Sequence, residues 1–297
     1  MDADSFDRAA QFIWRHARLL DRRQFAHTFV EPDPDGVAAA ALAYRNADGG
    51  FGNALEPDCR TPHSQPESTR LGLLALAGVG RLDADVATAA ARWLESVSTP
   101  QGGVPFCLPT VDGYPRAPWW QPGGDPAPPS LNPTAALVGI LRAAGAGGTW
   151  LDLAERWCLD ELDRMLADGR APSHYEAECL AELLEHAADA ERTAETTDGV
   201  LRMLASGAVV PLDPDAVGGD DPHTPLQVAP TPDHLFRVAF PDTVVAVFLD
   251  HLESEQQDDG GWPISWPAPG DTAVWEWRGN RTLVALGTLR AYGRLAT

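Results

Sequence analysis

Apolar residues recur at spacings of three and four along much of the chain, which is the period of an α-helix with one buried face. In one set of segments Asp, Glu and Arg alternate with Leu, Val, Phe and Trp, as in helices with one face in water. A second set is apolar nearly all round, as in helices that pack on several sides. The amphipathic set covers residues 5–20, 83–97, 150–167, 189–205 and 240–255; the apolar set covers 66–76, 132–141, 173–184 and 280–289. We therefore predict an inner layer of apolar helices covered by an outer amphipathic layer.

Helix-start signals support the apolar set. Pro66 followed by Glu67 suits a first turn, and Asn132 before Pro133 predicts a capped N-terminus. Ser173 and Glu176 form a capping-box pattern. Strand signals are few, so the sequence predicts an all-α protein.

A glycine corner repeats along the chain. The three copies are Asp48-Gly-Gly-Phe51, Gln101-Gly-Gly-Val104 and Asp259-Gly-Gly-Trp262. The sequence distance from the second corner to the third is close to three times the distance from the first to the second. Recurrence at such a period is typical of stacked helical hairpins. We predict an α/α toroid of about five to six hairpins around a central cavity. It would form a single domain over residues 1–297, with the proline-rich loop at 107–133 inserted over its mouth.

Composition and charge exclude several classes of function. The 297 residues include 22 Lys and Arg against 43 Asp and Glu, a formal net charge of −21. Non-specific nucleic-acid binding and docking on anionic membranes both need a basic face. There is no apolar run long enough to span a membrane and no signal peptide at the polar start, so we expect no membrane span. Four dispersed cysteines indicate a reduced, cytoplasmic protein.

The corners resemble those of a known superfamily. Gln257-Asp-Asp-Gly-Gly-Trp262 resembles the QW-type repeat of squalene–hopene cyclases, and Ala47-Asp-Gly-Gly-Phe-Gly52 resembles its counterpart in protein prenyltransferase subunits. The chain is thus similar to the terpenoid cyclase and protein prenyltransferase α/α-toroid superfamily. Segments 46–58 and 275–279 look most like its short bacterial prenyltransferase or squalene-cyclase-repeat proteins. This resemblance implies a toroid that handles isoprenoids.

Two acidic motifs of that superfamily are missing. The sequence contains neither the DxDD acid of class II cyclases nor a DDxxD motif, although Glu56-Pro-Asp58-Cys59 keeps acids at the first and third positions. Asp58, Cys59 and His63 are the residue types of a prenyltransferase zinc site, but they lie too close in sequence for a defined ligand set. The polar loop Asp220-Asp-Pro-His223 is interpreted as solvated. We therefore expect no metal and no cofactor.

Glu56 and Asp58 are the main candidates for catalysis, with His63 and Glu67 beside them for substrate binding. In a toroid, loops that lead into inner helices line the mouth of the cavity. Burial there raises a carboxyl pKa, which suits a general acid. The structural alternative is that these acids bind backbone amides or nearby arginines. For Glu67 we favour the structural role, because an acid in a first turn complements the helix dipole.

A second group lies near the C-terminus. Trp275, Glu276, Trp277 and Arg278 would open the last inner helix, and ring closure would bring them near the start of the chain. Glu276 is a candidate catalytic acid or base, and the others are candidates for substrate binding. Glu276 and Arg278 are two residues apart and so would not pair with each other on a helix.

The remaining candidates for substrate binding are large rings in proline-rich loops and a histidine at a helix start. They are Trp119, Trp120, Trp266 and His174. An aromatic wall can stabilise a carbocation or stack on a sugar, and the sequence does not decide between these.

Three functions remain open. The leading one is an isoprenoid-handling enzyme that starts or ends a carbocation reaction with Asp58 or Glu56. The second is a carbohydrate-active hydrolase or lyase, with Glu56 or Asp58 as the acid and Glu276 or Glu67 as the base. The third is a non-catalytic scaffold or small-molecule binder. The expected partner is a small molecule, isoprenoid or glycan; the sequence does not decide whether a second subunit completes the site.

Overall fold

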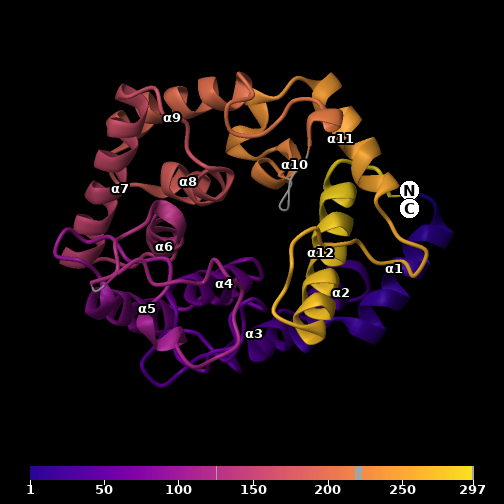
Figure 1. Cartoon of the computed structure of the whole chain (residues 1–297), viewed down its shortest axis with the longest axis horizontal. Coiled ribbons are helices and arrows are strands. Elements are labelled where there is room, and N and C mark those ends of the chain that lie inside the picture. The colour runs from indigo at the N-terminus through magenta and orange to yellow at the C-terminus, as the bar shows by residue number, and fades with distance from the viewer. Residues whose placement is uncertain (125, 218–222, 296–297) are drawn as a thin grey trace. The chain divides into compact units, whose positions relative to one another are not determined.

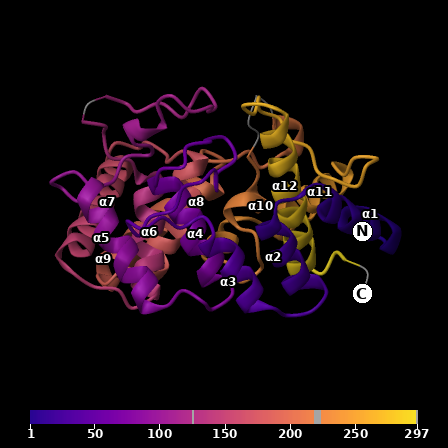
Figure 2. The same ribbon diagram turned by 90° about the horizontal axis from the view of Figure 1, so that it is seen from below.

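The computed structural model describes residues 1–124, 126–217 and 223–295, and its regular structure is helical (Figures 1 and 2). Asp220 and Asp221 of the predicted polar loop lie outside these residues. The α-helices are α1 (Ala3–His16), α2 (Leu19–Phe29), α3 (Pro34–Leu42), α4 (Pro66–Ala77), α5 (Ala84–Val97), α6 (Leu131–Ala143), α7 (Thr149–Ala167), α8 (His174–His186), α9 (Ala190–Ala205), α10 (Pro225–Val228), α11 (Asp242–Ser254) and α12 (Asp271–Ala291). Three short 3-10 helices are η1 (Pro109–Val111), η2 (Pro214–Ala216) and η3 (Leu235–Ala239). The predicted all-α fold is confirmed.

The chain forms two compact units. The middle unit contains residues 41–203, and the terminal unit contains residues 1–40 together with 204–297. The prediction of a single closed domain stays a prediction, and the two units are described separately below.

The middle unit has the two predicted layers. Helices α4, α6 and α8 form one row, and α5, α7 and α9 lie outside it (Figure 1). The α6 helix is buried over nearly its whole length from Leu131 to Leu141 and packs along α8. A Cβ atom on Gly139 would lie 2.1 Å from the backbone oxygen of Glu182, so only glycine permits this approach. The apolar helices therefore form the packed row, as their composition predicts.

In the terminal unit the last helix packs against the first two. Helix α12 contacts α1 and α2, and Gly279 faces the backbone of Ala17. The N-terminal ammonium of Met1 donates to Glu253 Oε2 at 2.9 Å and to the backbone oxygen of Arg294 at 2.7 Å. The contact predicted between the last repeat and the start of the chain is present.

The glycine corners share one geometry, shown by the first glycine of each pair. Gly49, Gly102 and Gly260 have φ of 101°, 102° and 92°. A Cβ on each would lie 2.6 Å or less from the backbone of an amphipathic helix, at Ala89 of α5, Ala154 of α7 and Arg8 of α1. The corner glycines thus let a turn lie directly against an outer helix.

Each corner is hydrogen-bonded to a threonine of the apolar helix that follows it. The residue after the two glycines donates its backbone N–H to this hydroxyl at 3.0 Å in all three copies. The pairs are Phe51 with Thr69, Val104 with Thr134, and Trp262 with Thr282. The same hydroxyls donate to the carbonyl four residues earlier, as in Thr69 to Gln65. The predicted repeat is therefore a repeated hydrogen-bonded unit.

Two predicted helix starts differ from the structure. Helix α12 begins at Asp271, four residues before the predicted opening at Trp275, and the amide of Asn280 within it donates to Asp21 Oδ1 at 3.4 Å. Asn132 has the extended backbone of a cap, at φ −92° and ψ 113°, but its side chain accepts from the thiol of Cys179. For Asn132, a tertiary partner thus takes the side-chain oxygen that the sequence assigned to capping. The Ser173–Glu176 capping box is present as predicted.

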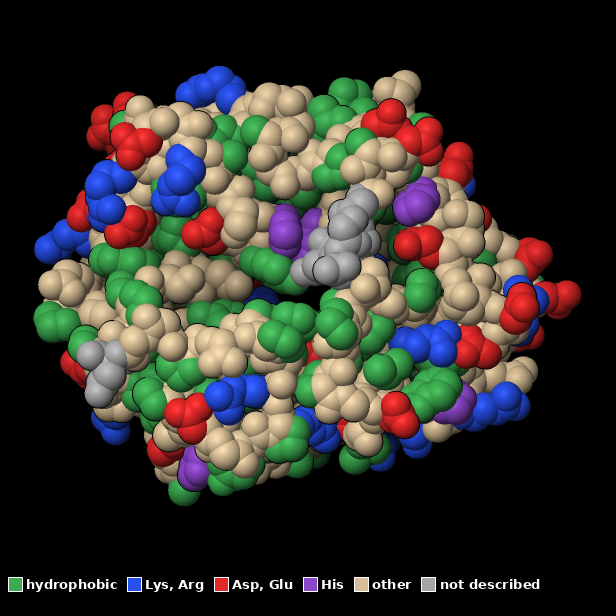
Figure 3. Space-filling view, in the orientation of Figure 1, with side chains coloured by type: hydrophobic (Ala, Val, Ile, Leu, Met, Phe, Trp, Pro, Cys, Tyr) green, Lys and Arg blue, Asp and Glu red, His purple; other side chains and the backbone are tan. Residues whose placement is uncertain are grey.

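Acidic and basic side chains lie interspersed on the face shown in Figure 3, rather than in separate patches. Several arginines bridge two acids, as Arg142 does between Asp152 and Glu155. Among the described helices none is both long and apolar enough to cross a bilayer.

All four cysteines are buried and form no disulfide. Burial raises the pKa of Cys59 and of Cys179 to about 12 and that of Cys107 to about 11. The pKa of Cys158 is also raised well above its usual value by burial. The folded state therefore favours neutral thiols.

These raised pKa values predict instability in alkali. A thiol held neutral by folding stabilises the protein fully below the unfolded pKa of about 9, and this contribution disappears as pH rises towards the folded value. We expect the free energy of unfolding to fall as pH increases from about 9 to 11, and the native thiols to react slowly with a disulfide reagent at pH 8. Urea titrations across this range and thiol kinetics check the prediction; reaction at the rate of free cysteine would contradict it.

Candidate functional site

The predicted acids lie in a loop of the middle unit that is covered by the proline-rich segment. Ala117 N donates to the backbone oxygen of Asp58 at 2.8 Å, and Arg60 N donates to Pro115 O at 2.9 Å. Thr61 Oγ1 donates to Thr110 O at 2.9 Å. These bonds hold residues 109–117 over the loop between the first corner and α4.

A small apolar core also forms where the proline-rich segment contacts the acidic loop. It consists of Cys59, Cys107, Val111, Ala117 and Trp120, with Phe106 packed against Trp120 at a ring distance of 4.8 Å. Trp120 is 1% exposed, so its ring packs inside this segment, whereas the neighbouring Trp119 is 44% exposed. Residues 106–120 thus cover the acidic loop, and the insertion predicted over 107–133 stays a prediction.

Glu56 and Asp58 are both buried under this cover, at 6% and 3% exposed. Asn53 and Ala54, just before them, have φ of 55° and 60° and are the non-glycine residues with positive φ in the described chain. For alanine this conformation costs about 1–2 kcal/mol. Strained backbone tends to persist where function requires it. Buried acids after a strained turn make this loop the main candidate for catalysis.

His63 lies at the edge of the loop and is exposed. Its ring meets Tyr114 edge-on at 5.8 Å, and Tyr114 Oη is 3.5 Å from His63 Nε2. His174 begins α8, where its ring is 4.3 Å from that of Tyr175.

Glu67 belongs to a polar cluster at the start of the apolar row. Arg70 donates from Nε and Nη2 to the two oxygens of Glu67, the first bond at 2.9 Å. The side chains are only 16% and 9% exposed. Cys179 lies near this pair, and its thiol donates to Asn132 Oδ1 at 3.5 Å. Glu67 therefore has a structural partner, in line with the role favoured from the sequence.

Arg278 joins the last corner to α12. It donates to both oxygens of Asp259 at 2.7 and 2.8 Å, and its guanidinium lies 4.6 Å from the ring centre of Phe12. Its hydrogen bonds lower the pKa of Asp259. Arg278 pairs with Asp259, as expected from its poor placement for Glu276 on the same helix. Trp275, 40% exposed, stacks on His16 at 4.5 Å.

The other candidates of the terminal unit lie on or against α12. Trp277 is on the helix, and Trp266 meets it edge-on at 5.3 Å. Glu276 is half-buried on the same helix. The catalytic and binding roles predicted for these residues stay predictions.

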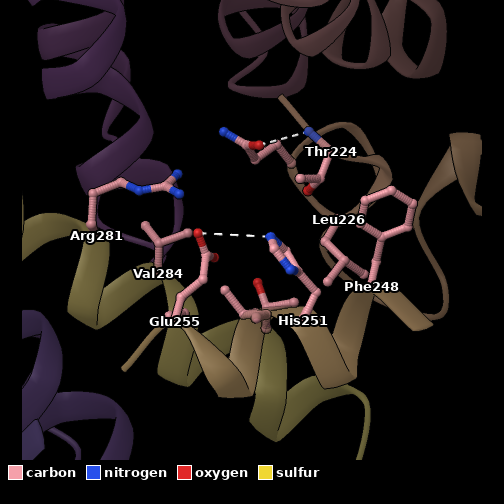
Figure 4. A pocket seen from close by; sticks show the side chains of 11 residues that line it. Thr224, Leu226, Phe248, His251, Glu255, Arg281 and Val284 are labelled. Atoms are coloured by element: carbon pink, nitrogen blue, oxygen red, sulfur yellow. Dashed lines mark hydrogen bonds and ion pairs between the residues drawn. The ribbon is translucent and has the colours of Figure 1, made fainter. Parts of the chain in front are cut away.

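A pocket that the sequence did not reveal lies in the terminal unit. Arg281 of α12, His251 of α11 and Glu255, the residue after α11, point into it, and Thr224 and Leu226 line its other side (Figure 4). His251 Nε2 is 3.9 Å from Glu255 Oε1. The residues belong to or directly flank α10, α11 and α12, so no single local motif marks them.

No group of three or more His, Cys, Asp or Glu suited to a metal occurs in the part of the chain that is described. The sequence-adjacent Asp58, Cys59 and His63 thus do not form one.

Comparisons with known proteins identify solved structures with a similar fold. No protein-family model and no curated protein sequence matches the chain. A protein from Actinoplanes is 16% identical with a TM-score of 0.59 over 98% of this chain and 99% of that one. The type II terpene cyclase MstE from Scytonema, without ligand, is 13% identical with a TM-score of 0.53 over 99% of both chains. A variant of MstE bound to its substrate, geranylgeranyl dihydroxybenzoate, is 13% identical with a TM-score of 0.53 over 96% of this chain and 97% of that one. The chain has a terpenoid cyclase-like fold along nearly its whole length.

Proposed function

We propose that this protein is an isoprenoid cyclase-like enzyme in which Asp58 or Glu56 protonates the substrate. The observation that carries the proposal is the burial of both acids, in a fold shared with a type II terpene cyclase. A buried carboxyl group is favoured in its neutral form, which still holds the proton to be transferred.

The proposed step is an acid-initiated isomerisation. The acid gives its proton to one carbon of an alkene, the other carbon becomes a cation, and the acid is left as a carboxylate. Other double bonds of the isoprenoid substrate then attack the cation and form rings. A base then removes a proton from the final cation and restores an alkene, so the product has the same mass as the substrate.

The experiment tests for this isomerisation by seeking a product with the mass of the substrate. Purified protein is incubated with geranylgeranyl diphosphate, farnesyl diphosphate and geranylgeranyl dihydroxybenzoate. Products are separated by chromatography and sought at unchanged mass. We expect Asp58→Asn or Glu56→Gln to lower turnover by a factor of at least about 100, as expected for loss of a general acid.

Asp85→Asn serves as the control, because this acid is exposed in the first turn of α5. It should leave turnover unchanged. Full activity in both Asp58→Asn and Glu56→Gln would contradict the assignment of the acid. Turnover of oligosaccharides in place of the isoprenoids would favour a carbohydrate-active enzyme, and turnover of neither would favour a non-catalytic binder.

A further inference from the structure

Glu56 and Asp58 leave almost no surface that a substrate could contact. Glu56 Oε2 and Asp58 Oδ1 are closed to solvent, and the two residues are only 6% and 3% exposed. A general acid must come within about 3 Å of the atom that it protonates. Some part of the middle unit must therefore move before either carboxyl group can reach a substrate.

The cover over these acids, residues 106–120, is well suited to such a movement. It contains the three-residue helix η1, and the rest of its backbone is irregular. It lies outside the helices of the middle unit, at the upper left of Figure 2. Helix α4, which follows the acidic loop, instead packs against both α5 and α6. Irregular segments with few packed contacts open locally while the rest of a domain stays folded.

Gln65 bonds to the cover through both ends of its side-chain amide. Its Oε1 accepts a hydrogen bond from Leu108 N at 2.8 Å, and its Nε2 donates to Thr110 Oγ1 at 2.7 Å. Gln65 is fully buried just before α4, and its own N–H donates to Phe51 O at 2.9 Å. The amide of Gln65 therefore joins the cover to both the first corner and the start of α4.

We propose that the cover opens as a lid over Glu56 and Asp58, and that Gln65 is the residue that holds it closed. In the closed state the cover excludes water, which protects a reactive cation from hydrolysis. In the open state a substrate can reach the acids. This use of the opening rests on the proposed function, whereas the opening itself can be measured without a substrate.

The buried cysteines allow that measurement. Cys59 and Cys107 belong to the apolar core between the cover and the acidic loop, whereas Cys158 and Cys179 are buried in α7 and α8. A buried thiol reacts with N-ethylmaleimide only after an opening that exposes it. Local opening exposes little surface and responds weakly to urea, whereas unfolding of the helices responds steeply.

The protein is labelled with N-ethylmaleimide at about pH 8, in urea concentrations below its unfolding transition, and each cysteine is followed by mass spectrometry of its peptide. We expect Cys59 and Cys107 to react together, faster than Cys158 and Cys179 and with little dependence on urea. Labelling of all four at one rate with one urea dependence would overturn the inference, as would slower labelling of the first two.

Gln65→Leu removes both amide bonds at similar size. Relative to Cys158 and Cys179, it should speed the labelling of Cys59 and Cys107 by about 10- to 100-fold, as expected for the loss of two hydrogen bonds. General destabilisation would speed all four alike and leave this ratio unchanged. Thr110→Val, at an exposed position of the cover, removes one of the two bonds and should raise the ratio by a smaller factor.

Gln121→Leu is the matched control, because Gln121 is exposed directly after the cover. It should keep the original rates. An unchanged ratio in Gln65→Leu would overturn the role of Gln65. Separate opening of the cover in a protein that turns over no isoprenoid would support this inference and count only against the proposed catalysis. Turnover in a protein whose cover does not open separately would do the reverse.

Discussion

Gly102→Ala is expected to lower the free energy of unfolding by about 3–5 kcal/mol, a large part of the stability of a typical domain. Two effects add at this position. The backbone has φ of 102°, which side chains other than glycine rarely adopt. An added Cβ would also lie 2.6 Å from the backbone nitrogen of Ala154 in α7, where no side chain can move aside.

Substitutions at two other glycines distinguish the cost of the positive φ from the cost of the steric overlap. Gly113 has φ of 84° but open space around its Cβ position, and Gly147 has neither a positive φ nor a close neighbour. We expect Gly113→Ala to cost about 1–2 kcal/mol and Gly147→Ala to have little effect. Urea denaturation of the three variants measures the order. If Gly102→Ala were no less stable than Gly113→Ala, the close packing of the corner against α7 would be contradicted.

The corners also explain why so much of this fold is predictable from sequence. A pair of glycines followed by an apolar residue meets a local requirement, namely positive φ and room for a neighbouring backbone. Helical periodicity is local too, and α5, α7, α9 and α11 begin within two residues of the predicted positions. Features that depend on neighbours in sequence could thus be predicted without the structure.

Features that depend on distant partners could not. The last helix was predicted to open at Trp275, whereas α12 begins at Asp271, and the amide of Asn280 within it donates to Asp21 of α2. The burial of Glu56 and Asp58 depends on a cover made of residues more than 50 positions away, which was predicted only as an insertion over a cavity. Arg281 was missed for the same reason, since α10 and α11 complete its pocket.

The second large effect concerns the buried pair Glu67–Arg70. Arg70→Met is expected to lower the free energy of unfolding by about 3–5 kcal/mol, because it leaves the Glu67 carboxylate buried without its bidentate partner. The ion pair itself explains why the Arg70 pKa is raised in spite of burial. Replacing both residues together, as in Glu67→Leu with Arg70→Met, should restore most of the loss, since no charge then remains to be desolvated.

An exposed pair with the same spacing provides the comparison. Glu161 and Arg164 are also three residues apart on a helix and bond at 2.8 Å, but Arg164 is 61% exposed. Arg164→Met should therefore cost less than about 1 kcal/mol. Chemical denaturation of the single and double variants measures the coupling within each pair. Similar costs at the two sites would mean that the Glu67 carboxylate does not depend on Arg70, and would return Glu67 to the candidates for substrate binding. A large cost at Arg70 that the double variant recovers would instead mean that Glu67 is held for stability, in line with Glu56 and Asp58 as the candidate catalytic acids.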